Sequence, residues 1–236
     1  MVGAEGVDGI SRSYARTAGV AGLVLFMMLV LGYGILLSGV PEATAAARSI
    51  TTYFLDHQSA TQVGIVVVML SMPFYLVFAS GVLVPLRQSD AKYGENFKFG
   101  AAAGILGTAV LVELQGGMWG LLASGLVATS APALLRPLFA LGQQLHPVAG
   151  AFLVLWYASV GIGGLRHHGF PRSLCWLAMV LALVEVVYTV AAVGLGGSLF
   201  RAFDPVEGGL SSLWIVSASI WMLAGAKVRA TEVSPR

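Results

Sequence analysis

The chain has 236 residues, of which 57% are apolar and only 10% are charged, and its formal net charge is +2. Soluble domains average about 25% charged residues, so this composition excludes a soluble protein and predicts an all-α integral membrane bundle. The single cysteine, Cys175, excludes an internal disulfide and any multi-cysteine metal or iron–sulfur site. The spans use most of the chain, so we expect residues 1–236 to form a single transmembrane domain.

Six apolar runs approach or exceed the ~20 residues that a helix needs to cross a ~30 Å hydrocarbon core. The predicted transmembrane helices are about Thr17–Val40, Thr61–Pro85, Phe99–Ser124, Leu138–Leu165, Ser173–Gly196 and Gly209–Ala226. The first run is longer than the 7–15 residues of a typical signal-peptide core, so we expect an uncleaved helix there. After it, Ala46, Ile50, Tyr53, Phe54 and His57 share one helical face. This pattern predicts either a short helix at the outer interface or a structured loop.

Orientation follows from the distribution of lysine and arginine. The N-terminus, the second and fourth connectors and the C-terminus hold ten of the 13 basic residues: Arg12, Arg16, Arg87, Lys92, Lys98, Arg166, Arg172, Lys227, Arg229 and Arg236. The other side holds Arg48, Arg136 and Arg201. Because cytoplasmic loops carry the excess of basic residues, both termini are expected in the cytoplasm. We expect the inner (cytoplasmic) membrane, with the lipid bilayer as the surroundings and no nucleic acid as a partner.

Two glutamates lie inside apolar runs, Glu113 in the third span and Glu185 in the fifth. At 1.5 Å per residue, Glu113, Glu185 and His146 fall in one layer, between the midplane and the outer third of a ~30 Å core. Helical spacing turns Glu113 and Glu185 toward neighbouring helices rather than lipid. Gln143 shares a face with His146 in the fourth span, and Tyr188 and Thr189 follow Glu185.

No lysine or arginine lies within a predicted span, so neither glutamate has a permanent cationic partner from this chain. An ionised carboxylate at the bilayer centre costs at least ~2.5–3.5 kcal/mol. We therefore expect either protonated glutamates or pairing of one of them with protonated His146 or with a bound cation. The plainer alternative is that each glutamate only hydrogen-bonds a neighbouring helix.

The layer predicts a polar pocket open to the outer side, with Glu113, Glu185, His146, Gln143, Tyr188 and Thr189 as ligand-binding residues. Glu113, Glu185 and His146 could supply three zinc ligands, but at no motif spacing, so we expect no metal. A pair of interior histidines for haem is missing, and no span has a lysine for a retinal Schiff base. We therefore expect no cofactor.

The stretches "YFLDHQSATQVG" (residues 53–64) and "PLFALGQQLHPVAGAFLVLWYASVGIGGLRHHGFPRSLCWLAMVLALV" (residues 137–184) also point to a family. In them the chain resembles a group of bacterial multi-pass membrane proteins, commonest in actinobacteria. The group has no assigned activity, so the resemblance implies a location and provides no catalytic residues.

Three functions stay open. The first, which we favour, is binding or transport of a small apolar or weakly basic molecule. The second is an intramembrane acid/base enzyme that acts on a lipid-soluble, isoprenoid-like substrate, with Glu113 or Glu185 as the general acid. The third is a non-catalytic subunit of a larger membrane complex or homo-oligomer, with small-residue faces at Gly100–Gly104 and Gly116–Gly120.

Overall fold

The computed structural model describes residues 4–42, 44–87, 91–127, 132–167, 170–192 and 197–231, and all regular secondary structure in these ranges is helical. The helices are α1 (Ala4–Leu36), α2 (Ala47–Asp56), α3 (Gln58–Arg87), α4 (Ala91–Leu121), the π-helical segment η1 (Leu122–Leu126), α6 (Pro132–His167), α7 (Arg172–Val190) and α8 (Gly197–Thr231). The predicted all-α class is therefore confirmed for the described residues.

Six of these helices contain a stretch that is long and apolar enough to cross a membrane. The stretches are Ser13–Leu36, Gln58–Val84, Phe97–Gly125, Ala133–Arg166, Arg172–Val190 and Pro205–Ala224. Their number confirms the six predicted apolar spans and is consistent with a multi-pass membrane protein in a lipid bilayer.

Several of the predicted ends need correction. The first stretch ends at Leu36 rather than Val40, and the sixth begins at Pro205 rather than Gly209. The fourth stretch begins at Ala133 rather than Leu138, because Pro132 has the fixed φ that suits a first helical turn. The fifth stretch ends at Val190 rather than Gly196, and residues 193–196 lie outside the described ranges.

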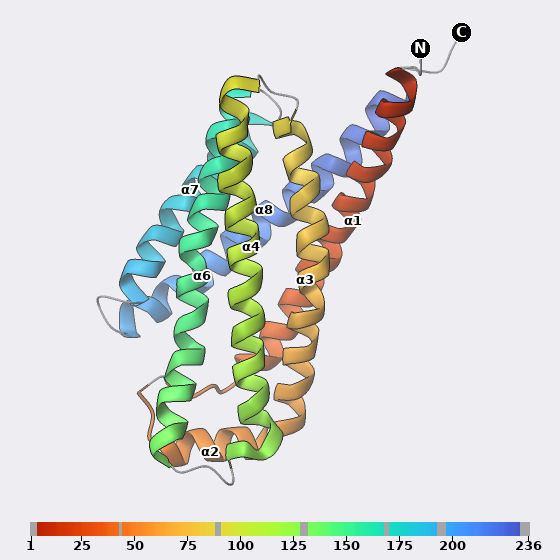
Figure 1. Cartoon of the computed structure of the whole chain (residues 1–236). Coiled ribbons are helices and arrows are strands. Elements are labelled where there is room, and N and C mark those ends of the chain that lie inside the picture. Colours follow the sequence, from red (N-terminus) through yellow and green to blue (C-terminus); the bar gives the residue numbers. More distant parts are fainter. Residues whose placement is uncertain are drawn as a thin grey trace.

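The long helices stand side by side, and α2 lies across one end of the bundle (Figure 1). α1 packs against α3 and α8, α4 packs between α3 and α6, and α7 packs against α6 and α8. The beginning of α1 and the end of α8 lie together at the end opposite α2, which we call the terminal end (Figure 1). The end of α3, the start of α4, the end of α6 and the start of α7 are at the same end (Figure 1).

Glycines bring α4 close to α6. A Cβ atom added at Gly104 would lie 2.7 Å from the Phe152 carbonyl oxygen and 2.7 Å from the Trp156 nitrogen. One added at Gly100 would lie 2.5 Å from the Ser159 hydroxyl. The Gly100–Gly104 face therefore packs inside this chain, where it lets two helices approach closely.

The segment after α1 forms the short helix α2, which decides between the predicted helix and the alternative loop. Its buried face is Ile50, Tyr53 and Phe54, as the spacing predicts. The Tyr53 hydroxyl donates a hydrogen bond to the Leu36 carbonyl at 2.9 Å. Burial raises the pKa of Tyr53, so the hydroxyl keeps the proton that it donates. α2 is thus tied to the last residue of α1.

Candidate functional site

Glu185 is completely buried in the contact between α6 and α7. The buried face of α7 contains Ala178, Leu181, Ala182, Glu185 and Tyr188, and its alanines let neighbouring helices approach. Gly150 of α6 lies directly against the carboxylate, because a Cβ atom added there would be 2.8 Å from Glu185 Oε2. The exposed fraction of Glu185 is 0%. Within the described part of the chain, neither carboxylate oxygen has a hydrogen-bond partner.

Thr189 and Pro147 hold α6 and α7 together one turn further along. The Thr189 hydroxyl donates to the Pro147 carbonyl oxygen at 3.0 Å. A Cβ atom added at Gly150 would also lie 2.8 Å from Thr189 Oγ1, so this glycine faces both polar side chains. Thr189 is therefore anchored on α6 beside Glu185.

His146 lies between two tyrosines from different helices. Its ring meets Tyr33 of α1 edge-on with 5.8 Å between centroids, and Tyr188 of α7 edge-on with 6.0 Å. The Nδ1 atom is buried and has no hydrogen-bond partner among the described residues. Nor does an ion pair join His146 to Glu185 or Glu113 in that part of the structure. The predicted histidine–glutamate pair is therefore not formed here. His146 and Glu185 are connected only indirectly, because the Tyr188 ring that contacts His146 lies one turn after Glu185 on α7.

Glu113 and Gln143 make no contact with this cluster that is comparable to those of His146 and Thr189. Both are half-buried, and no hydrogen bond or ring contact within the described ranges joins either of them to Glu185. The neighbouring Gln115 is the side chain that reaches α6, where its Nε2 donates to the Gly142 carbonyl at 3.1 Å. Of the six predicted ligand residues, the structure brings together Glu185, His146, Tyr188 and Thr189.

A second buried acid, Glu207 of α8, joins Glu185. It is 8% exposed and lies close enough for the two carboxyl groups to interact electrostatically. Ser211 donates to Glu207 Oε1 at 2.9 Å, and the Tyr157 hydroxyl of α6 donates to Ser211 at 3.2 Å. We call Glu185, Glu207, Ser211 and Tyr157 the acid centre. It is assembled from α6, α7 and α8.

The sequence carried a signal for Glu207 that span prediction missed. The sixth span was expected to begin at Gly209, which left Glu207 in a connector. Glu207, Ser211, Trp214 and Ala218 share one helical face at i, i+4, i+7 and i+11. In the structure Trp214 and Ala218 are fully buried, and Glu207 continues their face.

Aromatic side chains close the acid centre toward the terminal end. The Trp214 ring meets Phe78, Trp156 and Tyr157 edge-on at centroid distances of 5.9, 5.9 and 5.4 Å. Its Nε1 donates to the Leu174 carbonyl at 3.1 Å, which fixes the ring. Trp214 is seven residues beyond Glu207, or about 10 Å nearer the terminal end. The layer separates the acids from that end of the bundle.

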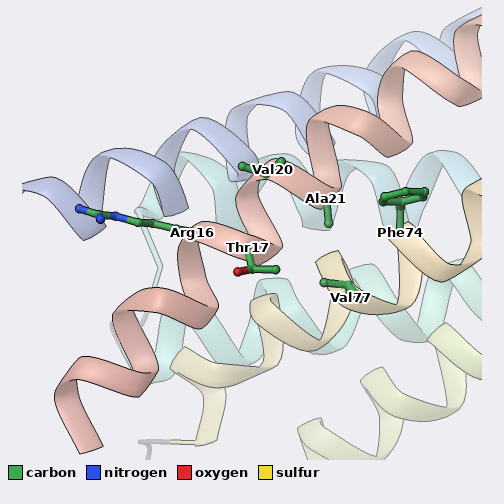
Figure 2. Close-up of a pocket in the computed structure, with 6 residues that line it drawn as sticks. All are labelled: Arg16, Thr17, Val20, Ala21, Phe74 and Val77. Carbon is green, nitrogen blue, oxygen red and sulfur yellow. The ribbon is translucent and has the colours of Figure 1, made fainter. Parts of the chain in front are cut away.

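A cavity of about 420 Å³ lies elsewhere, on the contact between α1 and α3 (Figure 2). It is lined by Arg16, Thr17, Val20, Ala21, Phe74 and Val77, and none of the six predicted ligand residues takes part. In Figure 2 the Arg16 guanidinium points away from Phe74 and Val77. The predicted polar pocket around Glu185 therefore stays a prediction.

Among the described residues no group of three or more His, Cys, Asp or Glu side chains could hold a metal ion.

No protein-family model, curated protein or solved structure matches the chain. The resemblance noted from the sequence therefore stays an expectation, and function has to be argued from the acid centre.

Proposed function

We propose that this chain is a multi-pass inner-membrane protein that binds or transports a small apolar or weakly basic molecule beside Glu185. His146, Tyr188 and Thr189 contribute to the same site, and Glu113 and Gln143 flank it. In this proposal both termini are cytoplasmic and the α2 end faces outward.

The observation that carries this proposal is the fully buried, unpartnered carboxyl group of Glu185. A buried polar group without a partner costs about 1–3 kcal/mol, and more when it is charged. The spans predicted from the sequence contain no lysine or arginine, and the nearby Glu207 is a second acid rather than a counter-ion. A proton or a basic ligand would supply the missing partner. Of the two proposed ligand classes, a weakly basic molecule therefore fits this site better than a purely apolar one.

The distribution of polar and aromatic side chains supports access from the α2 end. His146, Thr189 and the Tyr33 and Tyr188 rings lie on one side of Glu185, and the Trp214 aromatic layer closes the other. Transport would require this aromatic layer to open, whereas binding alone would not.

The proposed orientation is supported by where the basic residues occur. The segments with ten of the 13 lysines and arginines are the chain ends and the connections after α3 and α6. In Figure 1 the start of α1, the end of α8 and the helix ends that flank both of those connections are at the terminal end. By the positive-inside rule this end faces the cytoplasm.

Native mass spectrometry of the protein extracted from its own membrane tests the binding proposal. The set is the wild type, Glu185→Gln, and Asp56→Asn as a control that makes the same chemical change at an exposed acid on α2. We expect a bound small molecule on the wild type and on Asp56→Asn, and at least a tenfold lower occupancy on Glu185→Gln. A bare wild-type chain, or equal occupancy in all three proteins, would contradict the proposal.

A further inference from the structure

The two carboxyl groups of the acid centre have different hydrogen-bond surroundings. Glu207 accepts a hydrogen bond from Ser211, and Ser211 in turn accepts one from Tyr157. In this series of hydrogen bonds, each hydroxyl donates in the direction of Glu207. Glu185 receives no donor on either oxygen from the described residues, although its side chain is entirely buried.

This difference determines where a shared proton would reside. Hydrogen bonds donated to a carboxylate stabilise its ionised form, whereas burial without donors disfavours that form. Two acidic groups that interact at close range do not both ionise readily, because the second negative charge is repelled by the first. Glu207 is therefore the better carboxylate and Glu185 the better carboxylic acid.

Among the described residues, the other groups within electrostatic range of Glu185 are tyrosines rather than lysines or arginines. Tyr75 of α3 and Tyr157 of α6 are within electrostatic range of Glu185. On α7 itself Tyr188 follows one turn later, where it contacts His146 of α6. The predicted spans contain no lysine or arginine.

Two buried hydroxyl groups point separately to an occupant. The Tyr75 and Thr108 hydroxyls lie close to each other across the α3–α4 contact. Apart from their interaction with each other, neither has a hydrogen-bond partner within the described residues, and the two side chains are 8% and 7% exposed. Buried polar atoms of this kind are usually satisfied by water or a ligand. They provide hydrogen-bonding capacity next to the acid centre for a polar group that the chain does not itself provide.

We propose that Glu185 and Glu207 together hold one exchangeable proton, which resides on Glu185, while the negative charge resides on Glu207. The site then carries one net negative charge, which matches an occupant with one positive charge, such as an organic ammonium group. The sharing of one proton is independent of the proposed function. The choice of an ammonium ligand rests on it.

Infrared spectroscopy of the purified full-length protein at neutral pH tests the proton assignment, because a protonated carboxylic acid has its own C=O stretching band. In the wild type we expect a carboxylic-acid component that Glu185→Gln removes and Glu207→Gln retains. Glu113→Gln provides the matched control, since Glu113 is a half-buried acid outside the pair. It should leave that component unchanged.

Ser211→Ala keeps the test valid if either pair variant fails to fold. It keeps both acids and removes the hydrogen bond that stabilises Glu207, so the Glu185 component should shift in frequency without being lost. A wild type without a carboxylic-acid band would overturn the proposal. So would a component that survives in Glu185→Gln, disappears only in Glu207→Gln, or does not shift in Ser211→Ala.

The ligand charge is measured separately, so that the two proposals can fail independently. Isothermal titration calorimetry of the detergent-solubilised wild type compares binding of triethylammonium with binding of 3-ethylpentane, the uncharged hydrocarbon of the same shape. The comparison shows whether the site prefers a positively charged ligand. We expect heat of binding for the ammonium probe and its loss in Glu207→Gln. If the infrared spectra place the proton on Glu185 but triethylammonium does not bind, the shared proton stands and the ammonium ligand is overturned.

Discussion

Gly150 shows how tightly a single position is constrained at the acid centre. The Glu185 carboxylate and the Thr189 hydroxyl occupy the space that a side chain at position 150 would need. Any larger residue must displace a buried polar group that has little room to move, because protein interiors are close-packed.

The variant Gly150→Ala should therefore destabilise the protein by about 1–3 kcal/mol, the usual cost of overpacking a well-packed interior. Gly117→Ala is the control, because a Cβ atom added at Gly117 meets nothing within 4 Å. That control should be neutral or stabilising by about 0.5–1 kcal/mol, since alanine favours a helix over glycine. Thermal unfolding in detergent gives both values, and equal midpoints for the two variants would contradict the close approach.

At this scale the sequence predicts some side-chain directions and leaves others undetermined. Ala178, Ala182 and Glu185 share a face of small and polar residues, and all three are buried. Glu113 was expected to face a neighbouring helix through Gly116, but it is only half-buried. α4 has glycines on more than one face, and helical spacing alone does not say which face meets which helix.

Among the elements, the end of α4 depends on one unusual backbone conformation. The π-helical segment η1 contains Gly125 at φ +91°, where residues with a side chain are strained. Two residues earlier, the Ala123 carbonyl accepts a hydrogen bond from Gln62 Nε2 of α3 at 3.1 Å. The turn thus positions a backbone acceptor against the next helix.

Gly125→Ala should cost about 1–2 kcal/mol, because alanine has a Cβ atom that opposes a positive φ. Gly120→Ala is the matched control, since it lies in the regular part of α4 and a Cβ atom added there also meets nothing within 4 Å. Chemical unfolding followed by circular dichroism separates the two. A Gly125→Ala variant as stable as the control would show that the positive φ is not required.

Sequence patterns identified a helix well where the length of an apolar run determines it. They were less successful where the end of a helix depends on packing against other helices. The six spans and the buried face of α2 follow from hydropathy and periodicity. The beginning of the sixth span was placed at Gly209, because Asp204, Pro205 and Glu207 resemble a connector by composition. Burial of Glu207 depends on Ser211 and Tyr157, and the latter comes from another helix, which one-dimensional patterns do not contain.

For the whole molecule, the proposed orientation can be tested by cysteine accessibility. The native Cys175 is buried, so the wild type gives a background value. Thr44→Cys places an exposed thiol at the α2 end, and Ser13→Cys places one near the start of α1. A membrane-impermeant maleimide applied to intact cells should label Thr44→Cys, and it should label Ser13→Cys only after permeabilisation. The reverse pattern would invert the orientation, and labelling of both in intact cells would contradict a membrane crossing by α1.

The meeting of α6, α7 and α8 at the acid centre is a property of the assembled bundle. Local sequence predicted that Glu185 lies in an apolar helix, and it could not predict that its neighbour would be another acid. That pairing results from the packing of α8 against α7 in the assembled bundle.

α7 also has a consequence for how the chain enters the membrane during synthesis. Its 19 residues extend about 28 Å, barely the thickness of a ~30 Å hydrocarbon core, and one of them is Glu185. An ionised acid makes insertion of such a helix less favourable, by roughly 2.5–3.5 kcal/mol when it lies at the helix centre. The Glu185 side chain is buried against Gly150 of the preceding helix, α6, and lies beside Glu207 of the following helix, α8. Insertion of α7 is therefore most favourable when α6 is retained beside the translocation channel and α8 follows, so that these three helices leave the channel for the lipid as a unit.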